Sequence, residues 1–179
     1  MYRSLDLFLS LVGLILFSPI MIVILIIGFL KNGSPLFRQL RVGYKQNNFT
    51  LLKFRSMSID TKSIATHLID FSNISLYGQF LRKTKIDELP QLINVLNGDM
   101  SLVGPRPCLP NQTKLISERK KRGVFNVKPG MTGLAQITGV TMKNPKILAK
   151  KDAEMIKKLN ILNYFYYLFK TFFLIIKKK

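Results

Sequence analysis

Cysteine, histidine and tryptophan are almost missing from this sequence of 179 residues, which has one cysteine (Cys108), one histidine (His67) and no tryptophan. A single cysteine excludes an internal disulfide framework and any multi-cysteine zinc site, and a single histidine removes most histidine-based metal sites. Acidic residues are also scarce, because 9 Asp and Glu stand against 28 Lys and Arg, for a formal net charge of +19. The chemistry must therefore rest on carboxylates, basic groups or the backbone, and we expect an anionic partner.

Length and hydropathy restrict the architecture further. A chain of this size holds one domain with a modest core and an anchor, so a multi-domain protein is not expected. The hydrophobic content of 47% argues against disorder. We expect an α+β fold, namely a small helix-rich, membrane-associated domain with a short β-hairpin. The predicted organisation is an N-terminal segment over residues 1–31, a central domain over 32–158 and a C-terminal helix over 159–179.

The N-terminal segment is the first candidate for membrane contact. No charged residue occurs from Leu7 to Leu30, and a helix of this length extends about 36 Å, enough for a hydrocarbon core of about 30 Å. A cleavable signal peptide is the competing interpretation, but the run is too long and lacks a small-residue cleavage site. Ser18 and Pro19 interrupt the run, and proline predicts a kink. Both a bent spanning helix and a re-entrant hairpin with its two ends on one face agree with the basic flanks.

The C-terminal segment is a second apolar stretch. From Leu159 to Ile176 only Lys170 is charged, and three lysines follow. Its aromatic residues, asparagines and basic tail favour a helix that lies in the membrane interface. A second spanning helix and a helix packed on the core are the alternatives.

Between these ends, local patterns predict the main elements. Residues 36–39 and 49–55 read as strands joined by a turn over 43–48, residues 57–75 as a loop with some helix, and residues 143–158 as a lysine-rich helix. The clearest soluble helix has leucine or isoleucine at the spacing i, i+3, i+4, i+7 and ends at Asn97 and Gly98. Its apolar face is Leu89, Leu92, Ile93 and Leu96.

Asp87 and Glu88 stand at the expected start of this helix, where Pro90 is tolerated in the first turn. Acidic residues are common at such positions because they cap the helix and interact with its dipole. Arg82, Lys83 and Lys85 precede the pair, however. Two carboxylates in a concentrated positive field, with room for a divalent cation, suit attack on a phosphate. No Walker-type glycine loop is present.

Three stretches of the sequence carry a resemblance to a known family. They are Leu81–Pro107, which includes the dyad and ends in Gly104-Pro105-Arg106-Pro107, the segment from Phe37 to Met57, and Val127–Gly139. They resemble the bacterial sugar transferases, the monotopic polyprenyl-phosphate phosphoglycosyl transferases. The Ser18-Pro19 pair coincides with the family's helix-breaking Ser-Pro, which favours the re-entrant anchor.

The resemblance implies transfer of a sugar 1-phosphate from a UDP-sugar to undecaprenyl or another polyprenyl phosphate, giving polyprenyl-diphosphate-sugar and UMP. It implies a ping-pong mechanism with an aspartyl-phosphosugar intermediate, which initiates surface polysaccharide or glycan assembly. The expected cofactor is Mg²⁺. The expected partners are the two substrates and membrane lipids, with no nucleic acid and an open oligomeric state. The expected location is the bacterial inner membrane, with the catalytic domain on the cytoplasmic face.

The family also implies roles for individual residues. Asp87 would be the nucleophile and a magnesium ligand, Glu88 would assist the second half-reaction or the metal geometry, and Arg106 would face the uridine diphosphate. The remaining substrate-binding candidates are Lys53, Arg55, Arg82, Pro105, Pro107, Gln136 and Asp152.

The sequence departs from the family pattern after Gly139. Met155 stands where a tyrosine usually follows the aspartate matched by Asp152, and Tyr164 stands near the position of a terminal-helix aspartate. A changed sugar specificity or a catalytically impaired member would both explain these departures. A membrane-tethered protein that binds anionic ligands is the alternative from another functional class.

Overall fold

The computed structural model describes residues 2–57 and 74–177. The loop predicted over 57–75 therefore lies almost wholly outside the described residues. The helices are α1 (Arg3–Asn32), α2 (Leu76–Thr84), α3 (Gln91–Asn97), α4 (Thr113–Lys121), α5 (Leu134–Ile137), α6 (Pro145–Lys158) and α7 (Ile161–Lys177), and three described short 3₁₀ helices are η1 (Tyr44–Gln46), η4 (Ile86–Glu88) and η5 (Val124–Asn126). The strands are β1 (Leu36–Val42), β2 (Asn48–Phe54), β3 (Ser101–Val103) and β4 (Gly130–Thr132).

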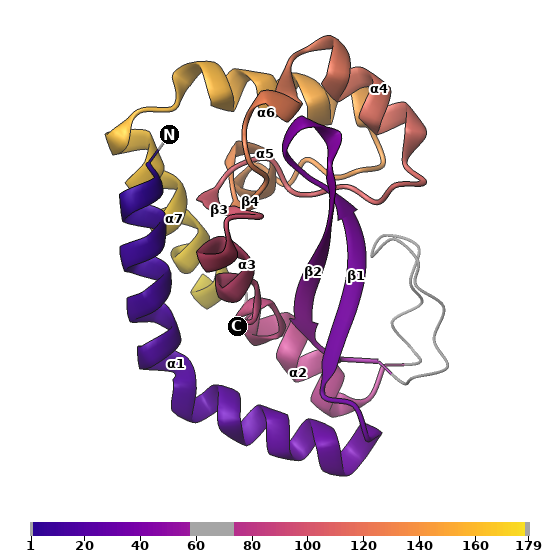
Figure 1. Ribbon diagram of the computed structural model, residues 1–179, viewed down its shortest axis with the longest axis vertical. Helices are drawn as coiled ribbons and strands as arrows, with labels where there is room; N and C mark the ends of the chain where they lie inside the picture. The colour runs from indigo at the N-terminus through magenta and orange to yellow at the C-terminus, as the bar shows by residue number, and fades with distance from the viewer. Residues whose placement is uncertain (1, 58–73, 178–179) are drawn as a thin grey trace.

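The strands form two separate two-stranded sheets in the described part of the chain. Strands β1 and β2 make the predicted antiparallel hairpin, with Leu36 opposite Phe54 and Val42 opposite Asn48. The short strands β3 and β4 pair in parallel, which local patterns did not predict because the partners are separated by α4 and its loops. Figure 1 shows α2 below the hairpin and α4 and α6 above it in this view, and the predicted α+β class is confirmed.

Helix α1 bends near its middle, as Pro19 predicts (Figure 1). Proline has no N–H, so the carbonyl of Ile15, four residues earlier, loses its helical donor. The hydroxyl of Ser18 donates a hydrogen bond of 2.8 Å to this carbonyl. The Ser-Pro pair thus bends the helix while keeping the freed backbone group satisfied, and α1 continues to Asn32.

The N-terminal end of α1 is fixed to the folded domain by one buried carboxylate. Oδ1 of Asp6 accepts hydrogen bonds from the hydroxyl of Ser101 (3.0 Å), the backbone N–H of Leu102 (2.9 Å) and the hydroxyl of Tyr164 (2.7 Å). Burial, together with Asp6, raises the pKa of Tyr164, so the phenol stays a donor. Tyr164, which stands near the position of a terminal-helix aspartate in the family pattern, therefore holds the N-terminal end of α1.

The other half of α1 lies against the same domain. The hydroxyl of Tyr77 in α2 donates to the carbonyl of Ile24 at 3.2 Å, and the Ile24 side chain is buried with Phe54 and Leu81. Contacts from both halves to one domain fix the bent shape of the helix.

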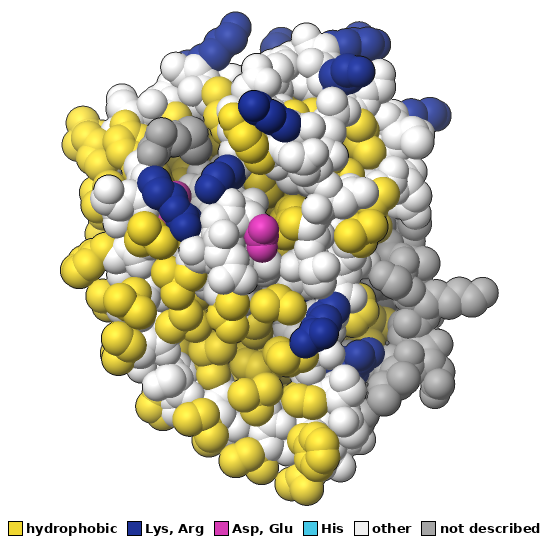
Figure 2. Space-filling model, viewed as in Figure 1, with side chains coloured by type: hydrophobic (Ala, Val, Ile, Leu, Met, Phe, Trp, Pro, Cys, Tyr) yellow, Lys and Arg dark blue, Asp and Glu magenta, His cyan; other side chains and the backbone are white. Residues whose placement is uncertain are grey.

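The remaining surface of α1 is apolar and open. The segment Arg3–Lys31 is long and apolar enough to cross a membrane, and 11% of its most apolar 18-residue window is buried. Figure 2 shows hydrophobic side chains gathered over the lower half of this view, where Figure 1 places α2 and the second half of α1. A core helix would bury such a surface, so the exposed apolar residues indicate association with a membrane.

Helix α7 has two different faces. Tyr164 and Tyr167 are buried in the main core, whereas Phe169, Phe172 and Phe173 are exposed. One face of α7 therefore packs on the core, as one of the alternatives predicts. For the exposed face, a position in the membrane interface stays a prediction.

We expect Tyr164→Phe to lower the free energy of unfolding by about 1.5–3 kcal/mol, the range for a hydrogen bond to a charged group. The change removes one donor from buried Asp6 and leaves the ring packing unchanged. Denaturant unfolding in detergent measures the effect. The matched control is Tyr166→Phe, because Tyr166 is 51% exposed. Equal stability of the two variants would show that the Asp6 contact contributes nothing.

Candidate functional site

The acidic pair lies one turn earlier than the predicted helix. Asp87 and Glu88 belong to η4, and α3 begins only at Gln91, so the prediction that they open the helix is wrong in this detail. The reason is Pro90, which cannot donate to the carbonyl of Ile86. That carbonyl instead accepts the N–H of Leu89, three residues later, at 3.1 Å. The 3₁₀ turn is tighter than an α-helix and holds the two carboxylates against the domain.

Glu88 is surrounded by three cations. Its Oε1 lies 2.9 Å from Nη2 of Arg106, 3.2 Å from Nζ of Lys53 and 3.7 Å from Nζ of Lys85. Burial alone would raise the pKa of Glu88, but Lys53, Arg106 and Lys85 outweigh it and hold the pKa well below the usual range. Glu88 is therefore an ionised anchor for basic side chains that come from separate parts of the chain.

Asp87 has the opposite character. Its side chain is buried, and Oδ1 has no hydrogen-bond partner among the described residues. Burial raises the pKa of Asp87, the charge of Glu88 adds to this, and Lys53, Lys85 and Arg82 act against it. A buried carboxylate oxygen with no partner in a basic surrounding is available for a reaction or for a cation.

The side chains of this site fit a magnesium ion that takes only one or two of its ligands from the protein. No group of three His, Cys, Asp or Glu side chains that could hold a metal occurs within the described parts of the chain. Magnesium, however, usually takes one or two carboxylates and completes its shell with water and substrate phosphates. The carboxylate of Asp87 can supply one such ligand.

Lys53 is positioned by a residue that local patterns did not identify. Asn94 in α3 accepts the N–H of Leu52 through Oδ1 at 2.9 Å and donates to the carbonyl of Thr50 through Nδ2 at 2.8 Å. The amide thus pairs with the open edge of β2 as a neighbouring strand would. In the sequence, the signal for this role is a polar asparagine between the apolar residues Ile93 and Val95.

Arg82, in α2, interacts electrostatically with Asp87. Its Nε donates to the hydroxyl of Ser56 at 2.8 Å, and Nη1 is buried without a partner among the described residues. Burial lowers the pKa of Arg82, and the charge of Asp87 acts against this. The unpaired guanidinium nitrogen of Arg82 is a donor that could bind a phosphate oxygen close to Asp87.

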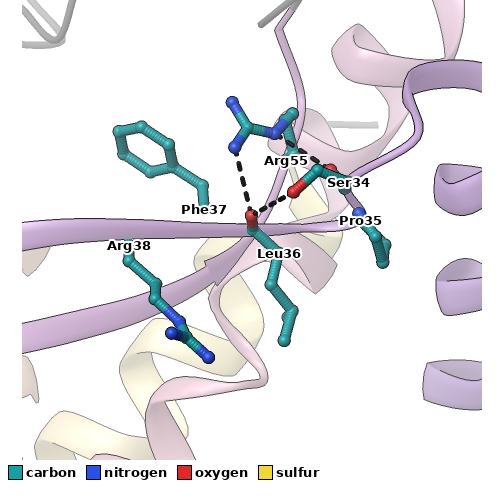
Figure 3. Close-up of a pocket in the computed structure, with 6 residues that line it drawn as sticks. All are labelled: Ser34, Pro35, Leu36, Phe37, Arg38 and Arg55. Atoms are coloured by element: carbon teal, nitrogen blue, oxygen red, sulfur yellow. Dashed lines mark hydrogen bonds between the residues drawn. The ribbon is translucent and has the colours of Figure 1, made fainter.

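Arg55 points elsewhere. Its Nε and Nη2 donate to the carbonyls of Ser34 (2.9 Å) and Leu36 (3.3 Å), and the guanidinium lies over the ring of Phe37 (Figure 3). These contacts line an open cavity of about 470 Å³ next to the end of α1. None of the contacts found for Arg55 within the described residues joins it to Glu88, whereas Lys53 and Arg106 meet there.

The segment that carries Arg106 is held by close backbone contacts. Gly104 donates to the carbonyl of Thr132 at 2.8 Å, and Gly130 donates to the carbonyl of Pro105 at 2.9 Å. A Cβ on Gly130 would lie 2.0 Å from the backbone nitrogen of Gly104, so only glycine permits this approach. The two small strands thus place Pro105, Arg106 and Pro107 beside the acidic pair.

Two further candidates lie outside the cluster around Glu88. Both amide atoms of Gln136 are buried without a hydrogen-bond partner among the described residues. Oδ2 of Asp152 accepts two hydrogen bonds from Arg119. Gln136 thus keeps free polar atoms for a ligand, whereas the carboxylate of Asp152 is engaged by Arg119.

Comparison with known proteins agrees with this site. The family model described as "Bacterial sugar transferase" matches residues 1–178, and the chain belongs to this family. The chain is 50% identical over 111 residues to the "Uncharacterized sugar transferase EpsL" of Bacillus subtilis, an alignment that covers 62% of this chain and 54% of that protein.

Two relatives have more informative names. The "Undecaprenyl-phosphate galactose phosphotransferase" of Salmonella typhimurium is 34% identical over 186 residues, 94% of this chain and 39% of the relative. The "UDP-glucose:undecaprenyl-phosphate glucose-1-phosphate transferase" of Klebsiella pneumoniae is 42% identical over 142 residues, 75% of this chain and 30% of the relative. The chain thus spans about half the length, or less, of these three curated relatives.

Proposed function

We propose that this chain is a phosphoglycosyl transferase that moves a sugar 1-phosphate from a UDP-sugar to undecaprenyl phosphate and so begins the assembly of a surface polysaccharide. One observation carries the proposal: Asp87 keeps a free carboxylate oxygen beside Glu88, which is held by three cations. Names of family relatives support the two substrates.

In the first half-reaction, Oδ1 of Asp87 attacks the β-phosphorus of the UDP-sugar. The bond from this phosphorus to the bridging oxygen breaks, UMP leaves with the electron pair, and an aspartyl phosphosugar forms. Arg106 places its guanidinium against the diphosphate, because an arginine fork matches phosphate oxygens. Lys53 and Arg82 add positive charge around the phosphorus.

In the second half-reaction, an oxygen of undecaprenyl phosphate attacks the same phosphorus. The acyl phosphate bond to Asp87 breaks, the carboxylate is restored, and polyprenyl-diphosphate-sugar is released. A magnesium ion bound to Asp87 and the phosphates would offset their negative charge. Glu88 keeps the basic side chains in place through both steps, and Gln136 is available for a hydroxyl or amide of the sugar.

The anchor is proposed to be re-entrant, with both ends and the catalytic domain on the cytoplasmic face. Support comes from α1 itself, because Asp6 near one end and Ile24 in the other half both contact the same domain. A straight span would separate these contacts by most of the membrane thickness. A shallow anchor also places the site at the membrane surface, where the phosphate of a lipid substrate lies.

We expect Pro19→Ala to straighten α1. In a fraction of the molecules the N-terminus should then lie on the periplasmic side of the membrane. The substitution restores a backbone donor for Ile15 and removes the steric cause of the bend. Labelling of a cysteine introduced at Ser4 with an impermeant reagent measures the change, because the native Cys108 is fully buried. The native N-terminus should label only from the cytoplasmic side, and labelling from the periplasm would contradict the re-entrant anchor.

The activity is tested by UMP release. Detergent-solubilised protein is incubated with undecaprenyl phosphate, Mg²⁺ and each of a panel of UDP-sugars, and UMP is quantified. We expect one or a few sugars to give many UMP molecules per protein when the lipid phosphate is present, and no more than about one UMP per protein when it is absent. UDP-sugar binding without UMP release would instead favour the impaired enzyme or the anionic-ligand binding protein.

A further inference from the structure

Arg119 and Asp152 form an ion pair in the interior of the domain. Arg119 lies in α4 and Asp152 in α6, and Nε and Nη2 of the arginine donate to Oδ2 of the aspartate at 2.9 and 2.7 Å. Each residue is 1% exposed. Taking two charges out of water costs about as much as their attraction returns, so a buried pair by itself is weak evidence for stability. We therefore expect the pair to have a role other than stabilising the fold.

The third contact of Arg119 reaches the candidate site. Its Nη1 donates at 2.9 Å to the backbone carbonyl of Arg106. The guanidinium is planar and rigid, so Asp152 fixes the direction of this third donor. The chain of contacts runs from Asp152 through Arg119 to the backbone of Arg106, whose side chain then reaches Glu88 at 2.9 Å.

The next carbonyl of the segment is held in the same way. Nη1 of Arg41, a buried residue of β1, donates to the carbonyl of Pro107 at 3.1 Å. Proline rings fix φ of Pro105 and Pro107, and Pro107 keeps the preceding Arg106 out of the α region. Rotation of the Arg106 carbonyl is a soft motion that remains, and Arg119 opposes it.

We propose that Arg119, oriented by Asp152, is a positioning residue that fixes the backbone of Arg106 so that its guanidinium is ready for the nucleotide diphosphate. This inference rests on the proposed function. It gives Asp152 an indirect role in place of the direct substrate contact that the family resemblance implies. Arg119 itself is too deeply buried to reach a substrate, and it acts only through Arg106.

Arg119→Lys tests the proposal, because lysine keeps the charge beside Asp152 but has no rigid fork to hold the carbonyl as well. We expect a rise of about tenfold or more in the Kd for UDP, measured by titration calorimetry, and in the KM for the UDP-sugar. A misplacement of about 1 Å can have an effect of this size or greater. The KM for undecaprenyl phosphate should stay within twofold.

The matched control is Arg122→Lys at the residue that follows α4, because the side-chain hydrogen bonds found for Arg122 among the described residues go to Glu118 and none goes to the Arg106 segment. Asp152→Asn is the second variant. It keeps the shape and an acceptor oxygen, and we expect a smaller rise in the Kd for UDP. A Kd and a KM equal to those of the native protein, with only a lower kcat or unfolding midpoint, would assign the pair a purely structural role.

The same series separates this inference from the proposed function. Absence of UMP release by the native protein would overturn the transferase activity alone, because UDP binding still reports the position of Arg106. Native UMP release with unchanged UDP binding in both variants would overturn the positioning role alone.

Discussion

Asp87→Asn is expected to lower kcat by a factor on the order of 10³ or more, the scale seen when a nucleophile is removed. An amide neither attacks phosphorus usefully nor binds Mg²⁺ well. The measurement is intact mass after incubation with UDP-sugar and Mg²⁺ in the absence of lipid acceptor. Native protein should gain one sugar phosphate, and the variant should gain none.

The same variant should be at least as stable as the native protein. Burial, with the charge of Glu88, raises the pKa of Asp87 in the folded state. An acid whose pKa is higher in the folded than in the unfolded state destabilises the fold at any pH above its unfolded pKa, because its charged form is disfavoured on folding. A neutral amide removes this cost. An unfolding midpoint no lower than that of the native protein would therefore accompany the loss of activity.

Glu88→Gln is the matched control, since it also removes one carboxylate from the dyad. The basic side chains lose their shared anion, and turnover should fall. The nucleophile remains, so the sugar phosphate should still load. Retention of the adduct on Asp87→Asn would show that another residue is the nucleophile, with Asp99 as the next candidate near the site.

Arg106→Lys is expected to raise the KM for the UDP-sugar by about tenfold or more and to lower kcat as well. Nη2 of Arg106 donates to Glu88, and no side-chain hydrogen bond found in the described part of the chain occupies the rest of the fork, which can therefore meet phosphate oxygens. A lysine has one ammonium group, which can pair with Glu88 or with the diphosphate but cannot present two parallel donors. Steady-state kinetics with varied UDP-sugar measure both constants.

Two comparisons make this prediction specific. Arg122→Lys changes an arginine in the same manner outside the site, and its kinetics should match those of the native protein. The charge of Glu88 raises the pKa of Arg106, so this guanidinium stays charged at every pH suited to the assay. A variant with native KM and kcat would remove Arg106 from the nucleotide site.

Local signals in the sequence were sufficient for the main elements. The uncharged run with Ser18 and Pro19 specifies a long apolar helix with a bend, because hydrophobicity and the missing proline donor act within a few residues. The periodic leucines and Gly98, which adopts a left-handed conformation (φ +91°), place the end of α3. The start of α3 was predicted too early, because Pro90 allows a tight turn before the helix that periodicity cannot distinguish from it.

The site was predicted only in part. The resemblance to the family selects as candidates Asp87, Glu88, Lys53, Arg82 and Arg106. The sequence does not show which of these charged side chains contact one another. The tertiary structure places Lys53 and Arg106, which are 35 and 18 residues from Glu88 in the sequence, on the same oxygen of Glu88. It leaves Oδ1 of Asp87 without a hydrogen-bond partner among the described residues. The two carboxylates therefore differ in character, although they are neighbours in the sequence.

The sequence by itself determined the apolar anchor, the hairpin, the central helix and the basic charge of the protein, because each depends on residues close together in the chain. Only the tertiary structure decided the contacts that join distant segments. Examples are Asp6 with Tyr164, 158 residues apart, and Arg119 with Asp152, 33 residues apart. Such pairs carry no local period or spacing, and burial makes them specific because each buried polar group must find a partner once water is excluded.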